Sequence, residues 1–171
     1  QDQQNQLENE IKQNTSKISE LKRQQAEENA RLFARNGGGG IRNVPDTSGY
    51  PWADYPFPNE VADPWGMYLR QCVSYTAWKV WKSGRYMPNW GGVGNANQWD
   101  DNARRAGIPV DSTPQVGDVA VSNSGYYGHV MYVESINPNG TINISQYNAS
   151  WTGSYSEATI SPVGLVFIHF P

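Results

Sequence analysis

A run of four glycines, Gly37 to Gly40, divides this sequence into two parts of different composition. Residues 1–36 contain no Pro, Gly or Trp, whereas the residues after the run are rich in all three. Asn36 and the glycines predict the end of a helix and the start of a flexible linker. Pro and Gly recur in the residues that follow, so we expect a linker over residues 37–50 and a separate domain over residues 51–171.

Residues 1–36 have the repeat pattern of a coiled-coil helix. Two interleaved heptad series run through them, Leu7, Asn14, Leu21 and Glu28 in one and Ile11, Ile18, Gln25 and Leu32 in the other. The polar members weaken the C-terminal half of this seam, and an Asn at a seam position often fixes register at some cost in stability. We expect the end of a longer coiled coil, and a solvated single helix is the alternative. A coiled-coil or membrane-protein partner bound through residues 1–36 follows from the same pattern.

Residues 51–171 carry helix signals first and strand signals afterwards. LRQCVSYTAWKVWKSG predicts a helix that Gly84 ends, and NANQWDDNARRAG predicts a second helix, capped by Asn95 or Asn97, that Gly107 ends. GDVAVSN predicts a strand, GHVMYVESI and TINISQYN predict a hairpin around NPNG, and LVFIHF predicts a last strand. Helices followed by an antiparallel sheet indicate an α+β fold.

Charge and hydropathy exclude two classes of protein. The formal net charge is −3, whereas phosphate binding uses clustered Lys and Arg, so we expect no nucleic-acid partner. No stretch of about 18 apolar residues is present, so we expect no membrane-spanning helix. The opening residues QDQQNQLENE lack a signal peptide, which fits a cytosolic protein or a secreted chain whose signal has been removed. Scarce Lys and Glu beside abundant Gly, Asn, Ser, Trp and Tyr favour an extracellular location.

The sequence contains one cysteine, Cys72, in the first turns of the first helix predicted after the linker. A single cysteine excludes an internal disulfide and a cysteine-rich zinc site, and its simplest role is a buried core residue. A thiol at a helix N-terminus is, however, biased towards the thiolate. His129 opens a predicted strand directly after Gly128. A cysteine at a helix start and a histidine at a strand start are typical of a papain-like thiolate–imidazolium pair.

Such a pair needs a third group that accepts the Nδ1–H of the imidazole. Gln146 and Asn148 lie two residues apart on the partner strand of the predicted hairpin, hence on one face. Glu134 is an odd number of residues from His129 and is expected on the opposite face. The other histidine, His169, is expected to be structural.

Five sequence segments after the linker are informative together: RQCVSYTAW, GNANQWDDNARRAG, PQVGDVAV, GHVMYVESI and NGTINISQYN. Together they resemble the CHAP domain, the cysteine, histidine-dependent amidohydrolase/peptidase family, over roughly residues 50–171. The resemblance implies a papain-like α+β fold and cleavage of amide bonds in bacterial peptidoglycan, as an amidase or an endopeptidase. By position, Cys72 matches the nucleophile and His129 the base.

The third catalytic position departs from the family pattern. The chain has Gln146 where a Glu is common, and Asn148 matches a further position linked to the site. A Gln carbonyl accepts the same hydrogen bond without a charge that stabilises the imidazolium, so we expect catalysis with a lower His129 pKa. For the oxyanion we expect the backbone N–H of Cys72 and the side chain of Gln71.

Aromatic residues suggest a substrate groove. We expect Trp90, Tyr127 and Trp151 to contact the glycan and stem peptide, and place three others, Trp78, Trp81 and Trp99, in the core. The loop before the nucleophile offers Asp63 as its one acidic residue, too few oxygen ligands for calcium, so we expect no metal and no cofactor.

The resulting hypothesis is a secreted, cell-wall peptidoglycan hydrolase that acts in wall remodelling, division or lysis. The first alternative is a catalytically weak or inactive wall-binding module regulated by the N-terminal coil, for which Gln146 is the hint. The second is a coiled-coil partner protein whose globular part is a scaffold.

Overall fold

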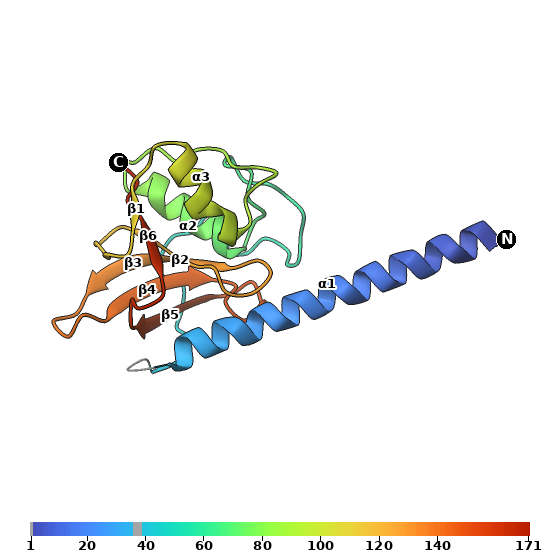
Figure 1. Ribbon diagram of the computed structural model, residues 1–171, viewed down its shortest axis with the longest axis horizontal. Coiled ribbons are helices and arrows are strands. Elements are labelled where there is room, and N and C mark those ends of the chain that lie inside the picture. Colours follow the sequence, from blue (N-terminus) through green and yellow to red (C-terminus); the bar gives the residue numbers. More distant parts are fainter. Residues whose placement is uncertain (1, 36–38) are drawn as a thin grey trace.

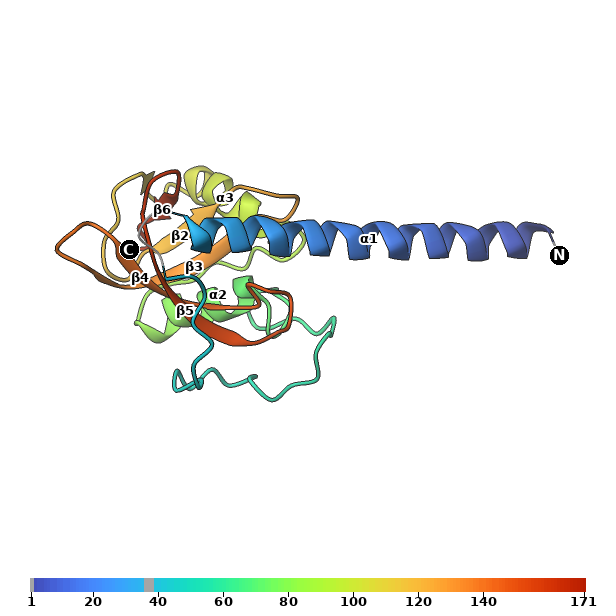
Figure 2. The same ribbon diagram turned by 90° about the horizontal axis from the view of Figure 1, so that it is seen from below.

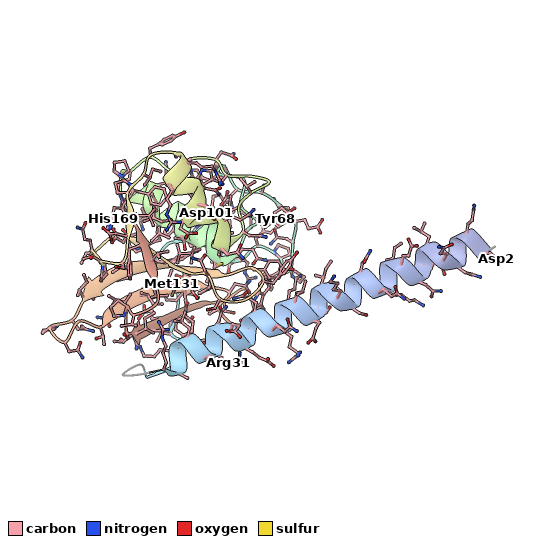
Figure 3. The ribbon with its side chains drawn as sticks, viewed as in Figure 1. Asp2, Arg31, Tyr68, Asp101, Met131 and His169 are labelled. Carbon is pink, nitrogen blue, oxygen red and sulfur yellow. The ribbon has the colours of Figure 1, made fainter. Side chains whose placement is uncertain are left out.

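The residues before the glycine run form one continuous helix, α1 (Asp2–Ala34). The computed structural model describes residues 2–35 and 39–171, so the predicted helix stop at Asn36 and the first glycines lies outside the described residues. The N-terminal part of α1 projects away from the rest of the chain, and its C-terminal part lies along the sheet (Figures 1 and 2). Side chains from Asp2 onward stand clear of the domain over the projecting part (Figure 3).

The strands form one antiparallel sheet in the order β1-β6-β2-β3-β4-β5. Their bounds are β1 (Val110–Asp111), β2 (Val119–Ser122), β3 (His129–Ile136), β4 (Ile142–Tyr147), β5 (Tyr155–Ile160) and β6 (Val166–Ile168). The predicted hairpin is β3–β4, with its turn at the NPNG segment. The sequence did not predict β1 or β5. β1 has two residues, and the sequence of β5 (YSEATI) consists mostly of small and polar residues, which are typical of a loop.

The sheet is covered on both faces, as the alternation of side chains along its central strands requires. Val119, Val121 and Val130 face a core formed with α2 (Cys72–Lys82), η1 (Ala96–Gln98) and α3 (Trp99–Arg105). Ala120 and Met131 face the opposite core, which the end of α1 completes. The fold is therefore α+β, as predicted, with α1 as an additional layer.

Helix α1 has two different halves. Leu7, Ile11 and Ile18 are exposed, as seam residues without a partner helix are, and they are consistent with the predicted coiled coil. Towards the C-terminus, Leu32 and Phe33 are buried in the core that they share with the sheet. Of the described residues, none lies in a helix both long enough and apolar enough to cross a bilayer.

The described part of the expected linker is anchored to the domain at both ends. Arg42 pairs with Glu157 of β5 through two backbone hydrogen bonds, and the Tyr50 side chain is buried. The division into segments 1–36, 37–50 and 51–171 stays a prediction, of which residues 36–38 lie outside the described part.

Candidate active site

Cys72 is the first residue of α2, in agreement with its predicted place in the first turns of that helix. The chain enters the helix through Arg70, whose φ of 64° is rare for a residue with a side chain. Its backbone N–H donates to the Tyr50 hydroxyl (3.0 Å), and its guanidinium donates to the carbonyls of Gly153 (2.9 Å) and Tyr55 (2.8 Å). These three bonds stabilise the turn that brings Cys72 to the start of α2.

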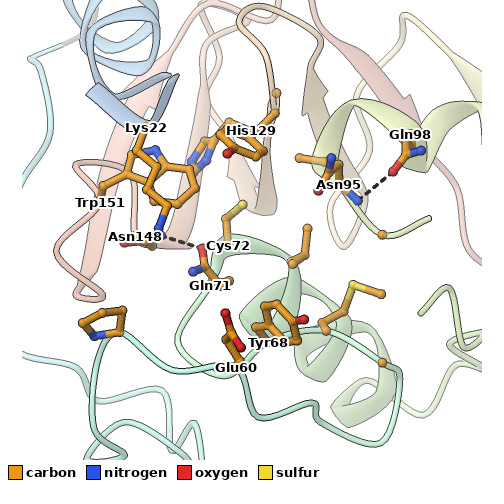
Figure 4. A pocket seen from close by; sticks show the side chains of 18 of the residues that line it. Lys22, Glu60, Tyr68, Gln71, Cys72, Asn95, Gln98, His129, Asn148 and Trp151 are labelled. Atoms are coloured by element: carbon orange, nitrogen blue, oxygen red, sulfur yellow. Dashed lines mark hydrogen bonds between the residues drawn. The ribbon is translucent and has the colours of Figure 1, made fainter. Parts of the chain in front are cut away.

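Burial reverses the expected ionisation of the thiol. It raises the pKa of Cys72 to about 11, because a thiolate loses its hydration there; the backbone N–H groups of Val130, Val73 and Cys72 itself oppose this shift only in part. At neutral pH the resting sulfur is therefore a thiol, not the thiolate that the helix N-terminus alone predicts. In Figure 4 the Cys72 side chain rises from the start of α2 towards His129.

His129 is the first residue of β3 and its side chain is buried. Gly128 before it has a φ of +70°, and a Cβ at that position would lie 2.7 Å from the backbone nitrogen of Asn97. Only glycine permits this close approach. The packing of the loop against η1 therefore depends on the glycine that the sequence places before the histidine.

The His129 ring is held by Gln146 of β4. Its Nε2 lies 2.7 Å from Gln146 Oε1, and the Gln146 amide nitrogen donates to Ser156 Oγ at 3.1 Å. Since Oε1 is an acceptor, the proton is on Nε2 and the lone pair is on Nδ1. The expectation that the third group accepts from Nδ1 was wrong about the nitrogen, because the ring presents Nε2 to Gln146.

Burial lowers the pKa of His129 to about 4, and the Gln146 hydrogen bond acts in the opposite direction. The lowered pKa agrees with the expectation for an uncharged partner. Its main cause is desolvation, not the lack of a carboxylate. At neutral pH both Cys72 and His129 are uncharged.

Asn148 does not contact the histidine through a hydrogen bond. It follows β4 in the left-handed conformation (φ 59°), donates from Nδ2 to Gln71 Oε1 at 2.7 Å, and accepts from the backbone N–H of Gly153 at 2.8 Å. Asn148 therefore orients Gln71, and Gln146 orients His129. The two amides that the sequence left as alternatives have different partners.

These side chains line a cleft of about 680 Å³. Of the predicted residues it contains Gln71, Cys72, Tyr127, His129, Asn148 and Trp151. The rings of Tyr127 and Trp151 lie 5.3 Å apart, and Lys22 of α1 lies over the Trp151 ring at 5.7 Å (Figure 4). Lys22 and Glu60 are the charged residues of the described lining.

Three residues for which the sequence predicted a position, two tryptophans and a histidine, lie outside the cleft. Trp90 is buried in the core against Trp99, with ring centroids 5.4 Å apart, so its expected substrate contact was wrong. Trp81 was expected in the core but is exposed. His169 is structural, as expected, with its ring nitrogens 2.7 and 2.8 Å from Asp111 and Asp118.

The sequence did not identify the contribution of α1 to the cleft. Lys22 and Asn29 line it, and Gln25 and Asn29 are buried polar residues one helical turn apart. The available signal was a polar residue, Gln25, at a heptad position where a coiled coil favours an apolar one.

Among residues 2–35 and 39–171, no cluster of three or more His, Cys, Asp or Glu residues could hold an ion. Asp63, in the loop before the nucleophile, accepts hydrogen bonds from the backbone N–H groups of Trp65 and Met67, both at 2.9 Å.

Three staphylococcal proteins are similar to part of this chain. The probable autolysin LDP of Staphylococcus aureus is 46% identical over 77 residues, which are 44% of this chain and 28% of the relative. The staphylococcal secretory antigen ssaA2 of S. aureus is 39% identical over 103 residues, 58% of this chain and 37% of the relative. The N-acetylmuramoyl-L-alanine amidase sle1 of Staphylococcus haemolyticus is 52% identical over 56 residues, 33% of this chain and 17% of the relative.

The fold has a solved counterpart. A crystal structure of an N-acetylmuramoyl-L-alanine amidase from S. aureus superposes with a TM-score of 0.57 and 30% sequence identity, over 68% of this chain and 35% of that one. The chain thus spans well under half the length of the relatives it matches. The CHAP domain model matches residues 62–148, which include Cys72, His129 and Gln146, and the chain therefore belongs to the CHAP domain family.

Proposed function

We propose that this chain is a peptidoglycan hydrolase that cleaves an amide bond with Cys72 as nucleophile and His129 as base. The observation that carries the proposal is the shared cleft, in which the half-buried thiol and the buried imidazole come from facing elements and Gln146 fixes the ring. The names of the relatives, an autolysin and an amidase, support the same substrate and reaction class.

The reaction begins from an uncharged pair. Nδ1 of His129 accepts the thiol proton as the Cys72 sulfur attacks the amide carbonyl, and the C–N bond breaks after a tetrahedral intermediate. The imidazolium returns that proton to the departing amine. Water, deprotonated by His129, then attacks the thioester, and the thiol is regenerated with release of the carboxylic acid.

The oxyanion of each tetrahedral intermediate needs donors that are already in place. The backbone N–H of Cys72 at the start of α2 is one. Gln71 is the second: Asn148 donates to its carbonyl oxygen, which leaves the Nε2–H groups to donate to the substrate oxygen. Asn148 acts here through Gln71, which revises its expected role beside the histidine.

Substrate binding is assigned to the walls of the cleft. Tyr127 and Trp151 offer aromatic faces to the sugar rings or the stem peptide, and Lys22 and Glu60 offer opposite charges to its carboxylates and amines. Both an N-acetylmuramoyl-L-alanine amidase and an endopeptidase fit this lining. The chain acts outside the cell, in wall remodelling, division or lysis, a location that the secretory antigen relative supports.

One observation favours a second function. Gln146 is uncharged and stabilises an imidazolium less than a carboxylate does, so a wall-binding module with slow or no turnover is the alternative. In that case Cys72 would still lie in the cleft, but its replacement would leave wall binding unchanged.

Mass spectrometry of digested peptidoglycan separates the two functions. Purified peptidoglycans of several cross-bridge types are incubated with the chain and with its Cys72→Ala variant. Soluble fragments that require the thiol support the hydrolase, and their new termini identify the bond that was cleaved. Binding to the wall without fragments from either protein would support the binding module.

A further inference from the structure

We propose that Gln25 of α1 is a positioning residue for His129. The C-terminal part of α1 then contributes to the geometry of the site. The inference rests on the proposed roles of Cys72 and His129, and it adds a requirement for a helix that the sequence assigns to a separate coil. The starting observation is that the Gln25 side chain is completely buried although it is polar.

The Gln25 amide is bonded to the loop that leads into β3. Its Oε1 accepts hydrogen bonds from the backbone N–H groups of Tyr127 (3.0 Å) and Gly128 (3.1 Å), the two residues directly before His129. Its Nε2 donates to the Ser124 carbonyl at 2.9 Å. One side chain of α1 thus provides partners for three backbone groups of this loop.

The same loop is held from its other side by η1. The backbone N–H of Asn97 donates to the Tyr127 carbonyl at 2.9 Å, and its side chain donates to the Tyr126 carbonyl at 2.8 Å. Gly125 lets the loop approach the Gln25 amide closely, since a Cβ there would lie 2.2 Å from Gln25 Oε1. The loop is therefore clamped between α1 and η1, and the position of His129 follows from the clamp.

Two further residues of α1 extend the contact along the same helix face. Asn29 accepts from Gln25 Nε2 at 3.0 Å and donates to the Ala149 carbonyl at 2.9 Å, next to Asn148. The Phe33 and His129 rings pack in a T-shaped arrangement, with centroids 6.0 Å apart. Residues spaced by four lie above one another on a helix, so Gln25, Asn29 and Phe33 form one row against the site.

A purely structural role for α1 does not account for this row. Covering the sheet requires apolar side chains, as Leu32 and Phe33 provide. A buried amide is unfavourable unless its hydrogen bonds are made, and here those bonds are made to the segment that carries His129. Removal of the acceptor leaves the N–H groups of Tyr127 and Gly128 without their partner, so the loop and the ring shift relative to Cys72.

The test uses the full chain with Gln25→Met, which retains the length of the side chain and removes its amide. Gln25→Glu keeps an acceptor oxygen, and Gln24→Ala, at the exposed neighbouring position, is the matched control. The first readout is the rate of Cys72 alkylation by iodoacetamide against pH, with His129→Ala as the rate of a thiol without its base. The second is the separation of kcat from KM on peptidoglycan.

We expect Gln25→Met to slow alkylation at neutral pH towards the His129→Ala rate and to lower kcat by about tenfold to 100-fold with little change in KM. Gln25→Glu, which keeps the acceptor for Tyr127 and Gly128 but loses the donor to the Ser124 carbonyl and Asn29 Oδ1, is expected to lie between Gln25→Met and the wild type, and Gln24→Ala equals the wild type. An unchanged alkylation profile and kcat in a folded Gln25→Met protein would overturn the proposal.

Hydrogen exchange on the wild-type chain tests the same contact without a variant. The Tyr127 and Gly128 amides are expected to be protected although they lie in a loop, and fast exchange at both would overturn the clamp even if Gln25→Met fails to fold. Alkylation requires no substrate. Alkylation that Gln25→Met slows, in a chain whose wild type gives no hydrolysis, would therefore contradict the proposed function and still support the positioning role.

Discussion

Replacing Gln146 by Glu introduces the carboxylate that is common in the family at the one position where this chain departs. The wild-type amide oxygen lies 2.7 Å from His129 Nε2, and Gln146 is fully buried. An opposite charge at hydrogen-bond distance raises a histidine pKa by about 1–3 pH units. We therefore expect the His129 pKa to rise from about 4 to between about 5 and 7, which stabilises the imidazolium by about 1–4 kcal/mol.

The consequence for the reaction follows from the sign of this change. The thiolate–imidazolium pair becomes a larger fraction of the resting protein, so Cys72 alkylation near pH 6–7 accelerates. Ser156, which accepts from Gln146 in the wild type, can rotate its hydroxyl to donate to the new carboxylate. The buried charge costs stability, and the variant is expected to unfold at a lower temperature.

Two measurements follow the effect. The imidazole titration is read from the NMR shifts of the His129 ring, and thiol reactivity is read from the pH profile of iodoacetamide alkylation. Gln146→Leu is the control that removes the acceptor without adding charge. A His129 pKa that is equal in the wild type and Gln146→Glu would refute the assignment of Gln146 as the direct partner of the ring.

Three further predictions concern stability and assembly. Phe33→Ala removes a fully buried ring from the core under the sheet and is expected to lower the free energy of unfolding by about 3–5 kcal/mol in urea titrations. Burial acts to lower the pKa of His169, but Asp111 and Asp118 together raise it above its ordinary value. The His169 interactions therefore stabilise the fold fully below about pH 6.5, and this stabilisation is lost as pH rises through the raised pKa. His169→Asn should remove this pH dependence from the free energy of unfolding. Substituting both Ile11 and Ile18 by Asp should abolish self-association in sedimentation experiments if residues 1–36 pair as a coiled coil, and an unchanged sedimentation coefficient would contradict that pairing.

The sequence predicted what depends on local patterns. Helix α2 and the β3–β4 hairpin followed from their periodicity and turn residues. Cys72 lies at the start of α2, within the predicted first turns, and His129 opens β3, as predicted. Asn95, one of the two cap candidates that the sequence offered, lies at the start of η1, where its backbone N–H donates to Gln98 Oε1 at 3.1 Å. These features depend on neighbours within a few residues, and such neighbours are visible in one sequence.

The misassigned residues depend on contacts between distant segments. Trp90 lies in a Gly-rich loop that suggests exposure, yet the ring inserts into the core beside Trp99 and Phe170. In the sequence, Gln25 is a polar residue that weakens a heptad seam. Its hydrogen-bond partners lie roughly one hundred residues later in the chain. No local pattern encodes such a pairing.

The ionisation of the Cys72 thiol was mispredicted for a physical reason that bears on the proposed reaction. A helix N-terminus favours a thiolate only where the charge keeps enough solvation, and the walls around Cys72 and His129 remove it. Phe33 lies against the ring on the side of α1, and the partner of Nε2 is the dipole of Gln146, not a charge. Both shifts oppose the ion pair, since the thiol pKa rises to about 11 and the imidazole pKa falls to about 4. In the proposed reaction, proton transfer from sulfur to Nδ1 therefore accompanies attack on the carbonyl, and the proposed role of Gln25 is to hold the loop that positions Nδ1.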